Sequence, residues 1–555
     1  MKVKLTVALL LLVFFFTVLT SVSTKSPVCD AAGHHIASGY SYAKTGNFWM
    51  NQCTPPLLRI LMGLPLLTQD LKFPVDHPSW AENNSTSFSY QFLFVYNSNA
   101  NRIVFLSRLP MILFSVVFGL FIFIWAKRLY GQGAGLFALF LYVFSPAILG
   151  NAGLAMLDAG CAFFMFLACF QFWRYLKRKT FMNLVLAGVC FGLAQSAKHT
   201  AVVLFPLFLV FIVADFTLNR KEWASSWKAI GSVLVIWIIG IFVLWATYLF
   251  EFKPLLVNVP DVEGKIEYIR KFSGSVPFID SKKLSDSLVY FAEKVPIPLS
   301  TYIVSLLGVI KTGIVGQRLV FMGRETFEGS KIYYLVDYLI KTPLPVLIML
   351  LFSVLSVRRR SEKDPVTNLV LLLPVFVVFG FASFSKVQGG LRYILPMYPF
   401  LFVWISDIVN VRFGKVTKVF KGVLLGLGAW FVVVSFSVYP HYLTYFNEII
   451  GGPGGTGYKV TTDMDWGQDF MALRNYLDEN DIRKVRLYCF GTVEPGYYGI
   501  EYEEIDNIEF EEPVAGSYYA ISSRFLGNVK WAKDYKPVDR IANTIFVYYI
   551  EEEKE

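Results

Sequence analysis

Eleven stretches of about 20 mostly apolar residues run through this chain, and they constrain its fold more than any other feature. A helix of that length can span the hydrocarbon core of a bilayer, because its backbone hydrogen bonds are all satisfied within the helix. The stretches are centred near residues 13, 118, 142, 164, 188, 208, 239, 349, 375, 400 and 430. Composition agrees, since 55% of the 555 residues are hydrophobic and the mean hydropathy is +0.51. We therefore predict a polytopic α-helical membrane protein with about 11 transmembrane helices.

Basic residues between the apolar stretches set the predicted orientation, because short cytoplasmic loops carry an excess of Lys and Arg. With the N-terminus inside, six groups of basic residues fall on the same side: Lys2 and Lys4; Lys127 and Arg128; Arg174, Lys177, Arg178 and Lys179; Arg220, Lys221 and Lys228; Arg358, Arg359, Arg360 and Lys363; Arg412, Lys415, Lys418 and Lys421. This agreement puts two long loops, residues 25–107 and 251–335, and the C-terminal tail outside. A cleaved signal peptide is the alternative for the first stretch, and it leaves the orientation unchanged.

The C-terminal tail differs from the rest of the chain in charge and in period. Residues 441–555 hold 11 Lys and Arg against 21 Asp and Glu, a net charge of −10, which leaves +20 for residues 1–440. A helical pattern after Asp469 is followed by strand-like runs at Val485–Phe490, Ser517–Ser522 and Thr544–Ile550. We predict a transmembrane domain over 1–440 and a small extracytoplasmic α/β domain over 441–555. Because the basic charge follows topology, no nucleic-acid partner is expected.

Two further sequence segments allow more than one interpretation. The apolar run from Pro298 to Gly316 contains Lys311 and is interpreted as an interfacial or re-entrant helix. Cys29 and Cys53 both fall in the first outer loop, where an oxidising compartment would allow a disulfide. The other four cysteines lie in apolar or strand-like stretches and are interpreted as packing residues.

Ionisable residues close to the apolar zone are costly and therefore mark candidate functional sites. They gather on the predicted outer side: Asp30, Asp158, Lys198, His199, Lys341, Lys386 and Arg392. A carboxylate there can take the proton of a hydroxyl while fixed cations stabilise a phosphate leaving group. The alternative for each cation is an ordinary interfacial residue that extends to lipid headgroups. The adjacent His34 and His35 cannot both face one metal ion from a helix, so no metal site is predicted.

Several segments, taken in order along the chain, resemble a known family. They are Asp30-Ala31-Ala32-Gly33-His34-His35-Ile36-Ala37-Ser38-Gly39-Tyr40, Gly46-Asn47-Phe48, Thr54-Pro55-Pro56-Leu57, Lys341-Thr342-Pro343-Leu344-Pro345, Gly390-Leu391-Arg392-Tyr393-Ile394-Leu395-Pro396, Tyr445-Phe446-Asn447, Gly451-Gly452-Pro453 and Asp463-Met464-Asp465-Trp466-Gly467-Gln468-Asp469. Together they are similar to the dolichyl-phosphate-mannose protein mannosyltransferase-like family, within the type C glycosyltransferase fold. The likeness is to its bacterial and archaeal members that use polyprenyl-phosphate sugars.

The resemblance implies an inverting glycosyltransferase in the plasma membrane that moves a hexosyl or mannosyl-type sugar from a polyprenyl-phosphate donor to an acceptor hydroxyl at the outer face. It implies a protein or glycolipid acceptor and neither cofactor nor metal. The resemblance implies that Asp30 occupies the position of the family's catalytic base. The residues expected to bind the donor phosphate are Lys198, Arg392 and Lys341. Those expected to position donor or acceptor are His34, Asp158, His199, Tyr393, Asp465 and Gln468.

Two departures from the family pattern keep alternatives open. Ala31 stands where the family usually has Glu, and Thr54 where it often has His. A non-catalytic relative that binds a polyprenyl phosphate is therefore one alternative. A transporter or flippase of a lipid-linked substrate is the other, because intramembrane charges also mark transport pathways. Transporters usually carry paired repeats, and none is evident in this sequence.

Overall fold

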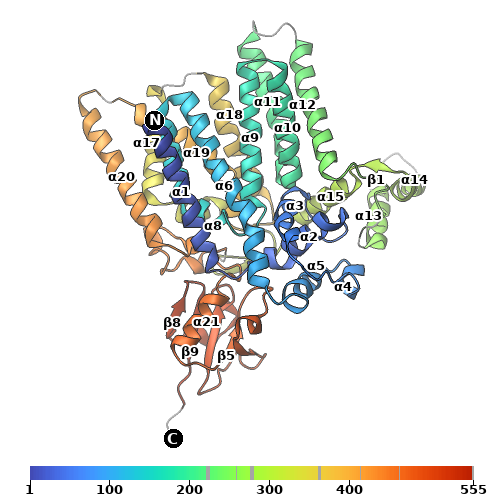
Figure 1. Cartoon of the computed structure of the whole chain (residues 1–555), viewed down its shortest axis with the longest axis vertical. Helices are drawn as coiled ribbons and strands as arrows, with labels where there is room; N and C mark the ends of the chain where they lie inside the picture. Colours follow the sequence, from blue (N-terminus) through green and yellow to red (C-terminus); the bar gives the residue numbers. More distant parts are fainter. Residues whose placement is uncertain are drawn as a thin grey trace.

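The computed structural model describes residues 1–220, 226–257, 259, 261–274, 281–360, 364–412, 414–461 and 463–552. Of the basic loop residues named above, Lys221 and Lys363 lie outside these ranges. The chain forms a large helical body with a small sheet domain at one end (Figure 1). This arrangement confirms the predicted polytopic helical fold with a C-terminal α/β domain, whereas the boundary at residue 440 and the limits of the two outer loops stay predictions.

Seven helices among the described residues are long and apolar enough to cross a membrane. They are α1 (Lys2–Ser23), α6 (Ala100–Tyr130), α9 (Asp158–Lys177), α11 (Leu204–Leu218) with its preceding turn η4 (His199–Val203), α12 (Ser226–Thr247), α18 (Pro365–Phe384) and α20 (Thr417–Ser437). An eighth candidate span is bent by 110° between α16 (Tyr333–Lys341) and α17 (Leu344–Leu355). Shorter apolar helices α7 (Gln132–Val143), α10 (Phe181–Ala197) and α19 (Met397–Ile405) complete the body. Each of the eleven predicted stretches coincides with one of these helices.

Helix α9 lies at the centre of the helical body. In the apolar stretch of α9, 89% of the residues are buried, compared with 28% in the apolar stretches of α1 and α20. The outward faces of α1 and α20 remain apolar and are therefore suited to contact with lipid. Aromatic rings surround α9: Phe166 packs on Trp125 and on Phe400, with ring centroids 4.9 and 5.1 Å apart. Asp158 is the first residue of α9, so central packing fixes the position of this carboxylate.

The first predicted outer loop folds into short helices beside the helical body. They are η1 (Ala31–His35), α2 (Ile36–Thr45), α3 (Leu57–Gly63), η2 (Leu64–Thr68), α4 (Pro78–Ala81), α5 (Ser85–Tyr90) and η3 (Gln91–Val95). Helices α2 and α3 cross at Gly39 and Gly63. A Cβ on Gly39 would lie 2.2 Å from the carbonyl oxygen of Arg59, and a Cβ on Gly63 would lie 2.2 Å from the carbonyl oxygen of Gly39. The close crossing holds the segment that follows Asp30 against the membrane helices.

In the second predicted outer loop the described residues form two amphipathic helices, one apolar helix, the hairpin β3–β4 and the antiparallel pair β1–β2, whose strands are far apart in sequence. Its elements are β1 (Phe252–Lys253), α13 (Val262–Gly274), α14 (Ser281–Lys294), β2 (Ile297–Pro298), α15 (Ser300–Val315), β3 (Leu319–Phe321) and β4 (Arg324–Thr326). Helix α15 corresponds to the apolar run interpreted as an interfacial or re-entrant helix.

The sheet domain contains helix α21 (Phe470–Glu479) and a five-stranded sheet in the order β6-β5-β7-β9-β8. The strands are β5 (Lys484–Tyr488), β6 (Glu501–Glu504), β7 (Tyr518–Ser522), β8 (Asp539–Ile541) and β9 (Ile545–Tyr549). Strand β5 pairs in parallel with β6 and β7, and the other pairs are antiparallel. The three predicted strands correspond to β5, β7 and β9. The edge strands β6 and β8 were not predicted, because one is largely charged and the other has three residues.

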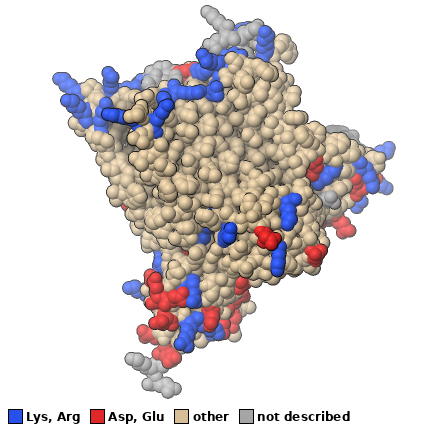
Figure 2. Space-filling view, viewed as in Figure 1, with Lys and Arg blue, Asp and Glu red and all other residues tan. Residues whose placement is uncertain are grey.

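On the face shown in Figure 2, charged side chains gather at the two ends of the molecule and on the flank formed by α13 and α14. Lys and Arg cover the end of the helical body away from the sheet domain, and a broad band without charge separates them from the acidic sheet domain. This separation agrees with the positive-inside prediction and with a multi-pass membrane protein.

Candidate functional site

The candidate site lies where the helical body meets the sheet domain. The Cys29 backbone N–H donates to the carbonyl oxygen of Trp466 at 2.8 Å, and the Thr492 hydroxyl donates to the carbonyl oxygen of Cys29 at 3.1 Å. These bonds tie the residue before Asp30 to the loop that enters the sheet domain and to the loop after strand β5. Asp30 and the sheet domain therefore lie on the same side of the helical body, as the orientation requires.

Asp30 forms an ion pair with Arg392, whose Nη1 lies 2.6 Å from the carboxylate oxygen Oδ2. Arg392 lies in the turn η7 (Leu391–Ile394), and its guanidinium stacks 4.0 Å from the centroid of the Trp466 ring. Burial alone would raise the pKa of Asp30, but the adjacent Arg392 outweighs it and holds that pKa well below its usual range. The carboxylate is therefore ionised at neutral pH, and its basicity depends on how much of its charge Arg392 neutralises.

A second ion pair joins Lys198 and Asp158, with Nζ 2.6 Å from Oδ1. Lys198 connects α10 to η4, and Asp158 begins α9. The Lys198 ammonium also lies 4.7 Å from the centroid of the Tyr393 ring, while Arg392 lies 5.4 Å from the same ring. Two cations that were predicted to bind the donor phosphate therefore lie near the same ring. The structure brings five predicted residues together here, namely Asp30, Asp158, Lys198, Arg392 and Tyr393.

Lys341 forms a third ion pair with Asp463, with Nζ 2.5 Å from Oδ1, and both side chains are buried. Asp463 also accepts the Leu391 backbone N–H at 3.0 Å, one residue before Arg392. Gly390 makes this approach possible, since its φ is +78° and a Cβ there would lie 2.2 Å from the Asp463 Cβ. Sequence reasoning named Lys341 but missed its partner, although Asp463 opens the quoted Asp463–Asp469 segment.

A pocket opens beside these groups. Its lining includes the polar or charged residues Asn151, Lys341, Arg392, Asp463 and Trp466, together with apolar side chains such as Pro146, Leu154 and Met156. Asp30 and Lys198 are not among its walls, and Asp30 adjoins the pocket through its ion pair with Arg392. An anionic head with an apolar tail matches such a pocket, because both cations and apolar groups line it.

The remaining predicted residues lie around this centre. The His34 Nδ1 lies 2.9 Å from the Ser85 hydroxyl, and the His199 Nε2 lies 2.7 Å from the Ser305 hydroxyl. Asp465 is buried, accepts the Gly467 N–H at 3.0 Å and is hydrogen-bonded by the Ser522 hydroxyl. Gln468 accepts the Trp466 N–H at 2.8 Å and donates to the Met464 carbonyl at 3.0 Å. These last two residues shape the loop that holds Trp466 beneath Arg392.

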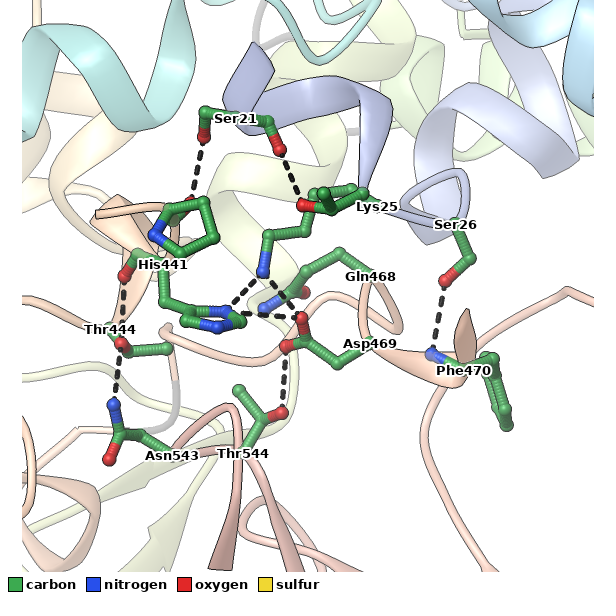
Figure 3. Close-up of polar contacts among 12 residues, drawn as sticks. Ser21, Lys25, Ser26, His441, Thr444, Gln468, Asp469, Phe470, Asn543 and Thr544 are labelled. Carbon is green, nitrogen blue, oxygen red and sulfur yellow. Dashed lines mark hydrogen bonds and ion pairs between the residues drawn. The ribbon is translucent and has the colours of Figure 1, made fainter. Parts of the chain in front are cut away.

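A cluster that sequence reasoning did not identify fastens the first helix to the sheet domain (Figure 3). Lys25, just after α1, lies between the His441 ring and the Asp469 carboxylate, with Nζ 2.7 Å from Oδ1 of Asp469. The other carboxylate oxygen accepts the Thr544 hydroxyl at 2.8 Å. Nearby, Arg108 donates to the carbonyl oxygens of Val22, Lys25 and Ser26, which fixes the chain that leads to Asp30.

Neither a metal cluster nor a disulfide is formed by the described residues. No group of three or more His, Cys, Asp or Glu side chains among them is arranged to hold a metal ion, and Cys29 and Cys53 are free thiols. The absence of a cofactor stays a prediction.

Comparison with known proteins supports the resemblance inferred from the sequence. The family model described as "Dolichyl-phosphate-mannose-protein mannosyltransferase" matches residues 101–245, from α6 to α12, which include Asp158, Lys198 and His199. No curated protein matches the chain.

Similar solved structures have low sequence identity. ArnT from Cupriavidus metallidurans bound to undecaprenyl phosphate is 12% identical, with 98% of each chain covered and a TM-score of 0.49. The oligosaccharyltransferase AglB from Archaeoglobus fulgidus, in complex with an inhibitory peptide and a dolichol-phosphate, is 13% identical, with 95% of this chain and 72% of that chain covered and a TM-score of 0.43. The S. cerevisiae protein O-mannosyltransferase Pmt1-Pmt2 complex bound to the sugar donor is 15% identical, with 45% and 34% covered and a TM-score of 0.33.

Proposed function

Since residues 101–245 of this chain match the dolichyl-phosphate-mannose-protein mannosyltransferase family, we propose that the protein is an inverting glycosyltransferase that uses a polyprenyl-phosphate sugar. The observation that carries the proposal is the Asp30–Arg392 ion pair at the edge of a pocket that also contains Lys341. A carboxylate and cations side by side are what transfer from a phosphate leaving group requires.

In the proposed reaction the acceptor hydroxyl attacks the anomeric carbon of the sugar. The new bond forms between the hydroxyl oxygen and that carbon, while the bond from the carbon to the phosphate oxygen breaks and the configuration inverts. Asp30 accepts the hydroxyl proton, and polyprenyl phosphate leaves with the electron pair. Arg392 has a double role, because a donor phosphate that shares its guanidinium weakens the Asp30 ion pair and makes Asp30 a stronger base.

The other predicted residues receive supporting roles. Lys198 and Lys341 add positive charge for the leaving phosphate, and Asp158 holds Lys198 in place. His34, His199 and Tyr393 are proposed to position the sugar or the acceptor, whereas Asp465 and Gln468 act through the loop that carries Trp466. The acceptor is proposed to be a protein or a glycolipid. The sheet domain is proposed to face away from the cytoplasm at the plasma membrane, because Lys and Arg gather at the opposite end of the molecule.

The test is sugar transfer by the purified chain from labelled polyprenyl-phosphate donors, with release of the free carrier as the readout. Asp30→Asn keeps the shape of the side chain but cannot accept a proton, so transfer should fall about 100-fold or more. Asp76→Asn changes an exposed aspartate of the same outer segment and serves as the matched control. Near-normal transfer by Asp30→Asn would remove Asp30 from the role of base. Movement of the intact donor between leaflets without release of its sugar would favour a transporter instead.

A further inference from the structure

Arg524 is a cation that the sheet domain brings to the site and that sequence reasoning did not identify. It follows strand β7 by two residues, and Phe490 follows strand β5 by two residues. Because β5 and β7 are parallel, their carboxyl ends meet at the same edge of the sheet. Ligands of α/β domains commonly bind beyond this edge. Here the edge faces the helical body, since Thr492, after β5, donates to the carbonyl oxygen of Cys29.

The surroundings of Arg524 are aromatic and cationic. Its guanidinium lies 4.0 Å from the centroid of the Phe490 ring and 5.7 Å from that of Trp466. The same indole carries Arg392 at 4.0 Å, so two guanidinium groups lie near one ring. Burial lowers the pKa of Arg524, and the charge of Arg392 acts in the same direction although Asp465 opposes it. Such an arrangement favours an anion between the two cations.

Arg524 differs from the other cations of the site because it forms no ion pair with any residue that the structure describes. Each of the others has a carboxylate within 2.7 Å, as in the pairs Lys25–Asp469, Lys198–Asp158, Lys341–Asp463 and Arg392–Asp30. In the described part of the chain Arg524 forms neither an ion pair nor a side-chain hydrogen bond.

Arginines with a structural role in this protein behave differently from Arg524. Arg108 donates to the carbonyl oxygens of three residues, and Arg540 donates to those of Gly454, Gly455 and Asn543. A guanidinium stacked for packing alone would be expected to use neighbouring carbonyl oxygens in the same way. The five N–H donors of Arg524 have no partner among the described residues and can bind a ligand instead.

We infer that Arg524 is an anion-binding residue that, together with Arg392, holds a phosphate oxyanion over Trp466. The geometry suits this ligand, because one planar guanidinium group can donate two parallel hydrogen bonds to two oxygens of a phosphate. A guanidinium group that is stacked on an aromatic ring is also preorganised for such binding. The inference rests on the proposed function for the identity of the anion, which is either the lipid phosphate of the donor or a phosphate group that enters separately with the acceptor. In both cases the sheet domain completes the site.

The test compares Arg524→Gln with Arg483→Gln in the full-length chain. Arg483 is exposed and directly precedes β5 at the opposite edge of the sheet, so this control removes the same charge from the same domain. The first measurement is the affinity for undecaprenyl phosphate in detergent micelles. The second is the affinity of the undecaprenyl-phosphate-loaded protein for inorganic phosphate. Thermal unfolding establishes that each variant is folded, and Arg524→Lys tests whether the charge alone restores binding.

Loss of one charge-assisted contact should weaken binding about 10-fold. A loss of undecaprenyl phosphate affinity confined to Arg524→Gln supports the inference with the lipid phosphate as the ligand. Unchanged affinity for the lipid, with phosphate binding lost from the loaded protein, supports it with a separate phosphate as the ligand. Unchanged affinities in both measurements, or equal losses in Arg483→Gln, would overturn it. These readouts do not require turnover, so they remain informative if sugar transfer is never detected.

Discussion

Replacing Lys25 by Met should destabilise the junction between the first helix and the sheet domain. Asp469, whose side chain is 1% exposed, would then lose its cation while remaining buried. In the intact protein burial opposes ionisation of Asp469, yet Lys25 and the His441 hydrogen bond lower its pKa from 3.8 to about 2. A shift of this size corresponds to about 2 kcal/mol of folding stability. Removal of the cation should cost more, about 3–5 kcal/mol, because an uncompensated charge stays buried.

The pH dependence of stability gives this prediction a sign. A carboxyl with a lowered pKa in the folded state contributes stability that is full above its unfolded pKa, near 4, and is lost as the pH falls toward about 2. The intact protein should therefore lose the contribution of Asp469 across that window. Lys25→Met should be less stable than the intact protein at neutral pH, and the difference should shrink as the carboxyl becomes protonated.

Thermal unfolding in detergent and limited proteolysis of the 441–469 segment are suitable assays. Lys530→Met is the matched control, because Lys530 pairs with Glu511 on the surface, where ion pairs contribute about 1 kcal/mol or less. The double variant Lys25→Met/Asp469→Asn should recover part of the loss, since no charge is left unpaired. The reasoning would be refuted if Lys25→Met melts like Lys530→Met, or if the double variant is no more stable than the single one.

Two further predictions concern buried carboxylates of the site. Lys341→Met should lower the free energy of unfolding by about 3–5 kcal/mol, because Asp463 would stay buried without its cation, and it should also weaken undecaprenyl phosphate binding. The double variant Lys341→Met/Asp463→Asn should regain stability but not binding. Equal stability of the single and double variants would contradict this. Burial raises the pKa of Asp465 from 3.8 to about 6. The contribution of this group to folding stability is therefore full below pH 4, and about 3 kcal/mol of it is lost as the pH rises through 6. Asp465→Asn should remove that slope, which thermal unfolding from pH 4 to 7 can measure, and an unchanged slope would assign it to other groups.

Sequence patterns with a local physical cause predicted most of the fold. Apolar runs long enough to span a bilayer identified the helices, because the bilayer imposes both length and composition on a spanning helix. Alternating apolar residues predicted β5, β7 and β9. The charged edge strand β6 left no such pattern, since its exposed side chains do not distinguish a strand from a loop.

The candidate site depended partly on sequence and partly on tertiary structure. Charge near the membrane surface was sufficient to select Asp30, Asp158, Lys198, Lys341 and Arg392, because placing an ionisable group there has a free-energy cost that depends on local sequence alone. Which carboxylate pairs with which cation was decided by the tertiary structure. Asp30 and Arg392 are separated by 362 positions in the chain, and their contact depends on how α1, η7 and the Trp466 loop pack.

Arg524 and the Lys25–Asp469 pair show the limit of sequence reasoning most clearly. Arg524 has no neighbouring motif, and the motif that ends at Asp469 gives no sign of Lys25. Each acquires its environment only when the sheet domain meets the helical body. A sequence determines the properties that a residue carries with it, namely its charge, its hydropathy and the period of its neighbours. The packed chain alone decides how deeply a residue is buried and whether its charge has a partner. These properties depend on contacts between segments that can be hundreds of residues apart.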